Sequence, residues 1–291
     1  MKKTLLTICL VWMCFSLSAQ KIIDLSGKWS FSIDRQDNGE KEKWFSHTLN
    51  DFINLPGSMP EKLKGDEVTA KTQWTGSLYD SSYYYNPYME KYRKEGNIKF
   101  PFFLTPDKHY VGAAWYQKEV NIPADWKGER ILLFLERPHI ETTVWVNGQK
   151  TGMQNSLCVP HQYDITHYVR PGKCTITIRV DNRIKEINVG PDSHSITDQT
   201  QGNWNGIVGR ICLQTTPKTY FDDIQIYPEP EQKLARVKVV IKGTGTAKVK
   251  LSAESFNTDK KHIVPAIQQE IKLNKGVTET EMVLPMGNDM L

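Results

Sequence analysis

Cysteine is scarce in this sequence, and the few cysteines present do not suit a metal site. There are five in 291 residues, and three of them, Cys158, Cys174 and Cys212, follow the N-terminal leader described below. An odd number allows at most one disulfide, and the sequence leaves its pairing open. All three lie within or beside apolar strand-like runs, so we expect small buried side chains. No two have the spacing of metal ligands and the seven histidines are dispersed, so we expect no metal and no cofactor.

Charge of one sign is also scarce. The chain has 37 Lys and Arg against 33 Asp and Glu, a formal net charge of +4. Lys2 and Lys3 belong to the leader, so the remaining chain carries +2 (4 − 2). Nucleic-acid binding requires basic residues gathered on one face or stripe, whereas here acids and bases are interspersed. We therefore expect no nucleic-acid partner.

The N-terminal apolar run is too short to anchor the chain in a membrane. Leu5–Phe15 is shorter than the roughly 20 apolar residues that a transmembrane helix needs. Lys2 and Lys3 precede the run and the small residues of Ser16–Ala19 follow it, which is the pattern of a secretory signal. We expect residues 1–19 to be a signal peptide and the mature protein to be exported. It would be periplasmic in a Gram-negative bacterium and secreted otherwise, with no membrane partner.

Helical periodicity is missing from any stretch long enough to cover a parallel sheet, so antiparallel β structure is predicted. Leu25–Ile33, Ala114–Ile122 and Cys174–Asp181 alternate between apolar and polar residues, while Arg130–Leu135 is apolar throughout. Asn147-Gly148 is a strong hairpin signal. We predict an all-β chain whose residues 20–218 form a jelly-roll sandwich of eight or more strands. Three tryptophans occupy strand positions that we expect to face its core: Trp29, Trp115 and Trp145.

A second all-β unit is predicted over residues 219–291. Thr219–Pro228 reads as a linking strand, and the four strands expected after it are Ala235–Lys242, Ala247–Phe256, Ala266–Leu273 and Thr278–Leu284. Their expected turns are Gly243-Thr-Gly245, Asn257–Lys261 and Asn274-Lys-Gly276. This resembles an immunoglobulin-like sandwich with fewer than the usual seven or so strands. We therefore expect an incomplete sandwich, poorly folded alone, and a chain that is a fragment or truncated product.

Residues 65–110 have the character of a long insertion. Neither helical nor strand periodicity is present, and six tyrosines gather there: Tyr79, Tyr83, Tyr84, Tyr85, Tyr88 and Tyr92. Long loops of this kind are usually functional or disordered, and this one is too aromatic to be freely disordered. It forms either a wall of a binding site or a loop that packs on the sandwich, and the sequence leaves both open.

The glycine-rich segment Gln201–Leu213 carries the strongest chemical signal. Gly202, Gly206 and Gly209 allow backbone angles that other residues resist, so a tight turn is expected. Asn203, Trp204 and Asn205 place an aromatic ring between two amides. Such a set suits a sugar, whose C–H face stacks on a ring while its hydroxyls need donors and acceptors. The alternative is a tryptophan that plugs the end of a β sandwich.

Several short segments, in order and spacing over residues 24–228, resemble the N-terminal part of glycoside hydrolase family 2, the β-galactosidase and β-glucuronidase family. They are Gly27-Lys-Trp-Ser-Phe31, Leu55-Pro-Gly57, Ala114-Trp-Tyr116, Val144-Trp-Val-Asn-Gly148, Tyr163-Asp-Ile-Thr166, Arg179-Val-Asp-Asn182, Gly206-Ile-Val-Gly-Arg210 and Asp222-Asp-Ile-Gln-Ile226. The resemblance implies a galactose-binding-like jelly roll, an immunoglobulin-like sandwich and then a (β/α)8 barrel with two catalytic glutamates. This sequence does not contain that barrel.

We name no catalytic residue in this chain. A retaining glycosidase needs two carboxyl groups held roughly 5–5.5 Å apart. The loop acids here are Asp107, Glu136, Asp192 and Asp198, and no motif pairs them. Enzymatic activity of this chain therefore stays open, while a longer parent would be a β-galactosidase-type enzyme.

The resemblance also implies sugar contacts in two loops. In the family, an acidic residue ahead of the Gly-Ile-x-Arg turn contacts the sugar; that position falls near Thr200-Gln201, whereas the nearest acid lies two residues upstream. A second contact is implied in the loop before Ala114. The candidate substrate-binding residues are Asp198, Gln201, Asn203, Trp204, Asn205, His109 and Tyr110.

The expected function is that of the non-catalytic N-terminal region of an exported retaining glycosidase. Its partners would be an oligosaccharide substrate and the C-terminal barrel. Whether the chain forms a homo-oligomer stays open, as do the sugar and its linkage. Two other classes remain: a stand-alone, lectin-like carbohydrate-binding module, and a purely structural or truncated product.

Overall fold

The computed structural model describes residues 20–76, 85–99, 105–185, 193–198, 200–257 and 260–288. The expected signal peptide and Tyr79, Tyr83 and Tyr84 of the insertion lie outside these residues. No helix in the described ranges is long and apolar enough to cross a membrane. Strands dominate, and every paired strand runs antiparallel to its neighbour, so the all-β prediction is confirmed.

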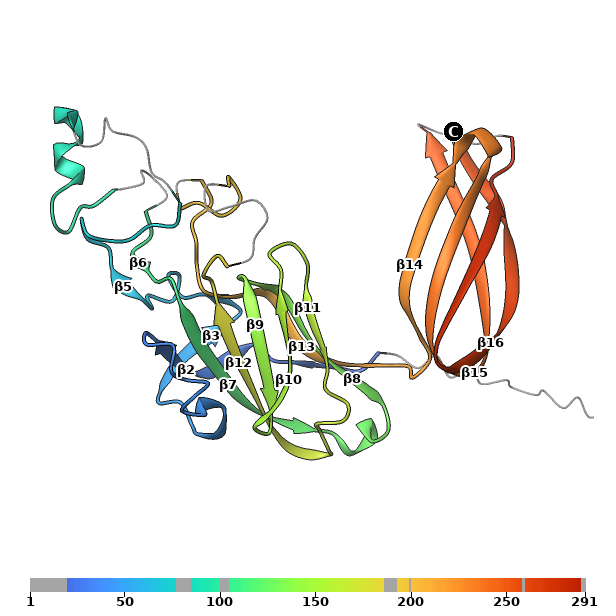
Figure 1. The fold of residues 1–291 in the computed structure, drawn as a ribbon, viewed down its shortest axis with the longest axis horizontal. Coiled ribbons are helices and arrows are strands. Elements are labelled where there is room, and N and C mark those ends of the chain that lie inside the picture. The colour runs from blue at the N-terminus through green and yellow to red at the C-terminus, as the bar shows by residue number, and fades with distance from the viewer. Residues whose placement is uncertain are drawn as a thin grey trace, which may run out of the picture.

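Two sheets form a sandwich (Figure 1). In order across the sheet, the first comprises β1 (Ile22–Asp24), β13 (Gly206–Thr216), β8 (Arg130–Pro138) and β11 (His161–Asp164), with β4 (Gly57–Ser58) also pairing β13. The second comprises β10 (Gln149–Asn155), β9 (Glu141–Val146), β12 (Gly172–Asp181), β7 (Ala113–Ile122), β2 (Gly27–Asp34) and β3 (Asp51–Leu55). Short 3₁₀ turns connect some strands: η1 (Trp44–Ser46), η2 (Pro87–Tyr92), η4 (Ala124–Trp126) and η5 (Pro230–Gln232).

The core between the two sheets follows from the alternation in their strands. In β12, Ile176 and Ile178 belong to this core, whereas Thr177, between them, points to the other face of the sheet. From the facing sheet, Leu133 and Ile211 meet them in the same cluster. Burial of these apolar side chains against the facing sheet is the main stabilising contribution.

A second apolar cluster lies on the outer face of the six-stranded sheet, and it corrects the expected direction of two tryptophans. Trp29 joins the main core, but Trp115 and Trp145 form a separate buried cluster with Leu49 and Phe45. The reason is the pleat of β7: Tyr116 points into the sandwich, so its neighbour Trp115 must point away. The segment after β2 covers this face, with Phe45 stacked on Trp145 at 5.2 Å between ring centroids.

The insertion between β4 and β7 has a small cluster of its own. β5 (Asp66–Glu67) pairs β6 (Lys108–His109), and Ile98 is buried against Trp74, Met89 and Tyr92. In the teal part of Figure 1 this segment extends beyond β5 and β6. Its described tyrosines therefore divide: Tyr92 packs within the insertion, whereas Tyr85 and Tyr88 are exposed.

The C-terminal unit is a three-stranded sheet of β14 (Tyr220–Glu229), β15 (Leu234–Asn257) and β16 (Lys260–Pro285), set apart from the sandwich in Figure 1. The four strands expected after β14 are present, but the first two are continuous as β15 and the last two are continuous as β16. Gly245 and Gly276, both at positive φ, lie where β15 and β16 were expected to turn, and the ladder continues through both sites with only a register shift at Gly243/Gly245. The expected turn at Asn257–Lys261 falls where β15 ends and β16 begins.

The small core of this unit joins the two halves of the long hairpin. Val237 and Val239 from the first half of β15 cluster with Val249 from its second half. On β14, however, Ile224 and Ile226 are 50% and 63% exposed, although their cross-strand partners Val239 and Val237 are buried. The second half of β15 and the first half of β16 therefore cover the first half of β15 but leave these side chains of β14 exposed to solvent, as expected of an incomplete sandwich.

The three described cysteines are free thiols. Cys174 and Cys212 are buried among apolar residues, as expected, and burial raises the pKa of Cys174 to about 11. Cys158 is exposed, so the expectation of burial is wrong for it. It lies in the loop after β10, outside either sheet.

Candidate functional site

The loop that precedes β13 is held to the sandwich by Asn205. Its Nδ2 donates to the carbonyls of Gly112 and Val180, at 2.9 and 3.0 Å, and the Tyr116 hydroxyl donates to its Oδ1 at 2.7 Å. All these groups are buried. Because its amide is fully used within the protein, Asn205 positions the loop and has no group left for a ligand.

Asp198 ties the loop to the insertion. Its Oδ1 accepts the backbone N–H of Asn203 at 2.6 Å, and its Oδ2 accepts the N–H of Thr75 at 2.6 Å. The same oxygen lies 3.2 Å from Nε2 of His109, whose ring meets Trp74 edge-on. Asp198 is 3% exposed. The carboxylate therefore links three segments of the chain and does not face solvent.

Asn203 continues this tie but is incompletely bonded. Its Nδ2 donates to Oγ1 of Thr75 at 2.8 Å and to the carbonyl of Asn182 at 3.0 Å. Its Oδ1 and Nε2 of His139 are both buried without a well-formed hydrogen bond among the described residues, although the Asn203 side chain lies near enough to the His139 ring to raise its pKa. Buried polar atoms without partners are rare and often lie at functional sites.

Trp204 lies over His139, with ring centroids 4.5 Å apart and planes 25° from parallel. Burial lowers the pKa of His139 to about 4, only partly offset by Asn203 and by the charge of Asp198. The imidazole under the indole is therefore neutral at physiological pH. Trp204 itself is partly exposed and Gln201 is exposed, so these two side chains present the loop to solvent.

The three glycines adopt the positive φ angles expected of them: 72° at Gly202, 143° at Gly206 and 76° at Gly209. Gly206 also allows a close approach, because a Cβ there would lie 2.5 Å from the carbonyl oxygen of Gly57. The turn can thus bring the loop against β4 while leaving the Trp204 ring at the surface.

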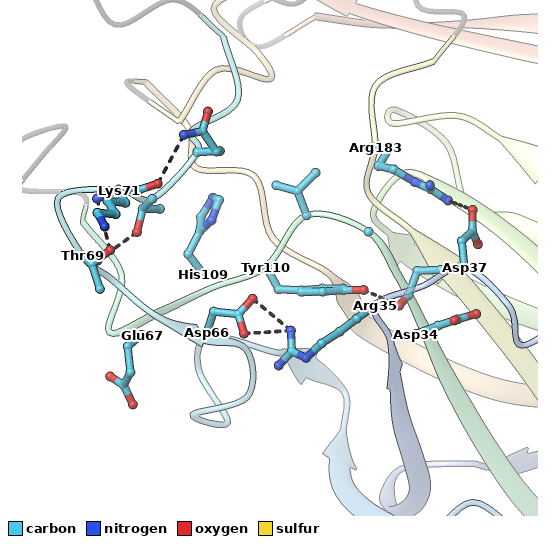
Figure 2. A pocket seen from close by; sticks show the side chains of 15 residues that line it. Asp34, Arg35, Asp37, Asp66, Glu67, Thr69, Lys71, His109, Tyr110 and Arg183 are labelled. Carbon is cyan, nitrogen blue, oxygen red and sulfur yellow. Dashed lines mark hydrogen bonds and ion pairs between the residues drawn. The ribbon is translucent and has the colours of Figure 1, made fainter.

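A cleft of about 510 Å³, lined mainly by charged and polar residues, is connected to this loop through His109 (Figure 2). His109 and Tyr110 line it, and both are buried at its wall. The Tyr110 hydroxyl donates to the carbonyl of Ala113 at 2.9 Å, and burial raises the pKa of that hydroxyl well above its usual range. His109 connects the cleft to the loop through Asp198.

The charged groups of the cleft are largely neutralised by one another. Figure 2 shows Arg35 paired with Asp66 and Arg183 paired with Asp37, at 2.7 and 2.6 Å. Lys71 lines the cleft without an ion pair among the described residues. A cleft of this kind offers many donors and acceptors but little net charge, which suits hydroxyl-rich ligands.

The structure thus brings the seven sequence candidates into one region, but only some of them reach solvent. Gln201 and Trp204 reach solvent, whereas the others are buried: Asp198, Asn203, Asn205, His109 and Tyr110. Only part of the loop therefore reaches solvent. Contact of any of these residues with a sugar stays a prediction.

Sequence reasoning missed His139, Thr75 and the charged residues of the cleft. A signal existed for Asn182, at the end of one family-like segment: its side chain accepts from Gly112 N–H at 2.8 Å and donates to the Tyr110 carbonyl at 2.9 Å. It fixes the turn between β6 and β7. His139 had no such signal, because it lies 65 positions from the tryptophan it supports (204 − 139).

A double-sheet antiparallel sandwich is an architecture that lectin domains, among others, adopt. Residues 22–217 match the model of the glycosyl hydrolases family 2 sugar binding domain. The chain belongs to glycosyl hydrolase family 2, as the sequence resemblance indicated.

Among similar proteins, the β-glucuronidase of Homo sapiens is 24% identical over 266 residues, which cover 82% of this chain and 35% of that protein. The β-glucuronidase of Paenibacillus borealis is 24% identical over 222 residues, covering 71% of this chain and 31% of that one. The chain thus spans about a third of the length of these relatives.

Solved structures agree on the fold. A β-glucuronidase from an uncultured Clostridium sp. superposes with a TM-score of 0.54 at 18% identity, over 93% of this chain and 40% of that chain. The β-glucuronidase from Ruminococcus gnavus in complex with D-glucaro-d-lactam gives 0.53 at 16% identity, over 92% and 40%.

Proposed function

We propose that this chain is the substrate-binding, non-catalytic N-terminal region of an exported retaining glycosidase of family 2. The observation that carries the proposal is the position of Gln201 and Trp204. Gln201 is exposed and Trp204 is partly exposed on a loop that Asp198, Asn203 and Asn205 hold to the sandwich and the insertion. A rigid support with an exposed amide and a partly exposed indole favours stacking and hydrogen bonding to a sugar at little cost in entropy.

Catalysis by this chain is disfavoured by the state of the acids in the cleft. A glycosidase acid/base requires a carboxyl group with a raised pKa, beside a second carboxylate. Burial would raise the pKa of Asp37, but hydrogen bonds from Arg183 and Arg179 outweigh it and hold that pKa below its usual range. Asp34 accepts from the N–H groups of Asn38 and Gly39 and from Trp115 Nε1. These acids stabilise the fold.

The substrate we propose is a terminal β-linked sugar on an oligosaccharide. The relatives and solved structures named above are β-glucuronidases, which favours a β-glucuronide over the β-galactoside that the sequence suggested. Lys71, the cation of the cleft without an ion pair in the described residues, is compatible with a uronate carboxylate.

Two assays on the purified chain test this proposal. Turnover of the nitrophenyl β-glucuronide, β-galactoside and β-mannoside should be absent, and turnover that follows the protein peak through purification would contradict the non-catalytic role. NMR titration with the matching methyl glycosides should detect millimolar binding, strongest for the glucuronide, because a single wall encloses a ligand poorly. Micromolar binding would favour a stand-alone lectin, and no binding would favour a structural module.

A further inference from the structure

Two tyrosines of the insertion lie on its surface, whereas two other apolar residues of the same segment are packed. Tyr85 is 81% exposed and Tyr88 is 85% exposed. Met89 and Tyr92, one and four residues after Tyr88, pack against buried Ile98 instead. The two tyrosines are three positions apart in the sequence, so their Cα atoms lie at most about 11 Å apart.

The backbone that carries Tyr88 is locally fixed. Asn86 caps η2, where its side chain accepts the N–H of Tyr88 at 3.0 Å and its carbonyl accepts the N–H of Met89 at 3.0 Å. Asn97 Nδ2 donates to the carbonyl of Lys91 at 2.8 Å, which closes the following turn. A ligand that stacks on Tyr88 therefore does not have to order the segment beneath it.

The surroundings decide what kind of ligand fits. Glu90, Lys91 and Lys94 follow the tyrosines in the sequence and are exposed, so charged side chains interrupt the apolar surface in this described part of the insertion. The two tyrosines together expose on the order of 300 Å². A stable protein interface needs about 800 Å² from each partner and a dry centre. The pair is too small and too wet for a protein partner.

A sugar chain meets these conditions. Each pyranose can stack one C–H face on an aromatic ring while its hydroxyls stay hydrated beside charged side chains. We propose that Tyr85 and Tyr88 form a second carbohydrate-contact surface, separate from the cleft and the Trp204 loop, which holds a glycan chain at a distance from the sugar that is recognised. This rests on the proposed function in taking the ligand to be a carbohydrate.

Native electrophoresis through gels that contain a soluble polysaccharide tests the inference. The probes are a mixed-linkage β-glucan, a pectic galactan and chondroitin sulfate, one in each gel. At least one should retard the chain relative to a probe-free gel. The double variant Tyr85→Ser/Tyr88→Ser should weaken that retardation about tenfold or more in apparent affinity, because both stacking contacts are lost. Its melting temperature should not change, since both side chains are exposed.

Two further variants separate the possible results. Tyr227→Ser removes an exposed tyrosine from β14 and should be retarded like the unchanged chain. Trp204→Ala should also be retarded, while losing its binding of methyl glycosides. Equal retardation of the double variant, or no retardation by any probe, overturns the tyrosine surface. Either result leaves the proposed function to be decided by the glycoside titration alone.

Discussion

Both carboxylate oxygens of Asp198 accept hydrogen bonds from the protein itself. One accepts the N–H of Asn203, and the other accepts the N–H of Thr75 beside His109. The family resemblance implied a sugar contact two residues further along the chain, at Thr200-Gln201, where this sequence has no acid. The buried position of Asp198 is consistent with that displacement. The carboxylate holds the loop in place and does not face solvent.

Removing this carboxylate should loosen the loop and destabilise the sandwich. Asp198→Ala leaves two backbone N–H groups without an acceptor, and we expect the free energy of unfolding to fall by about 3 kcal/mol. Urea denaturation measures it. Asp107→Ala, at an exposed position of the same insertion, is the matched control and should change it by less than about 0.5 kcal/mol. An equal loss of unfolding free energy in the two variants would show that Asp198 does not hold the loop in place.

His139 should make the protein less stable in acid. Burial lowers its folded pKa to about 4, against 6.5 for an ordinary histidine, so between these values the unfolded state binds the extra proton. Stability should therefore fall as the pH drops from about 6.5 to 4, by up to about 3 kcal/mol from this residue. His139→Gln should flatten that part of the profile in urea denaturation.

Two other histidines help to interpret the result. Burial also lowers the pKa of His161, and that contribution persists in the His139→Gln variant. His167 is exposed, and His167→Gln is the matched surface substitution. If His139→Gln retained the full acid sensitivity of the unchanged chain, the buried neutral imidazole beneath Trp204 would be ruled out.

At the scale of elements, the strands were predictable because alternation and hairpin signals are local. The period of β2 and β12 and the Asn147-Gly148 turn could be read directly from neighbouring residues. The direction of Trp115 could not, because in a strand with apolar residues on both faces the pattern does not say which face meets the other sheet. The sequence predicts two separate strands in place of β15 and two in place of β16. The prediction is wrong there because glycines that indicate turns lie within a continuous ladder.

The candidate site was predictable in part for the same reason. The positive φ angles of the glycine loop follow from local sequence, whereas the sequence left open whether Trp204 faces solvent or plugs the end of the sandwich. The partners that fasten the loop come from distant segments, Thr75 and His139 among them, and no local pattern indicates them.

Glycine substitutions test the geometry of this loop. Gly206→Ala would place a Cβ 2.5 Å from the Gly57 carbonyl oxygen and 2.9 Å from Cα of Ser58, so the backbone of β4 would have to move. We expect it to cost about 3 kcal/mol of stability. Gly202→Ala, with no atom within 4 Å, should cost about 1 kcal/mol from its positive φ alone. Similar costs would contradict the close contact between β13 and β4.

At the scale of the whole molecule, the two β units differ in how completely they are covered. The sandwich encloses its core between two sheets, whereas the C-terminal sheet leaves Ile224 and Ile226 of β14 in solvent. Fewer buried contacts imply a lower free energy of local opening. The C-terminal unit should therefore open more readily than the sandwich.

Hydrogen exchange measures this difference on matched positions. β15 lies between two neighbours in its sheet, as β12 does in the sandwich, so the amides of both can be hydrogen-bonded. We expect amides of Val237, Val239 and Ile241 to exchange faster than those of Ile176 and Ile178. Equal protection would mean that the C-terminal sheet is as stable as the sandwich despite its uncovered strand.

The central claim is that a sugar binds against the exposed edge of the Gln201–Leu213 loop. Its most direct test is an NMR titration of the chain with methyl β-glucuronide that follows the indole N–H signals. The Trp204 signal should shift with a dissociation constant in the millimolar range. Trp204→Ala should abolish binding, whereas Trp44→Ala, at a partly exposed tryptophan on the outer face of the six-stranded sheet, should retain it. Binding that survives Trp204→Ala, or a titration in which only other indoles shift, would contradict the account.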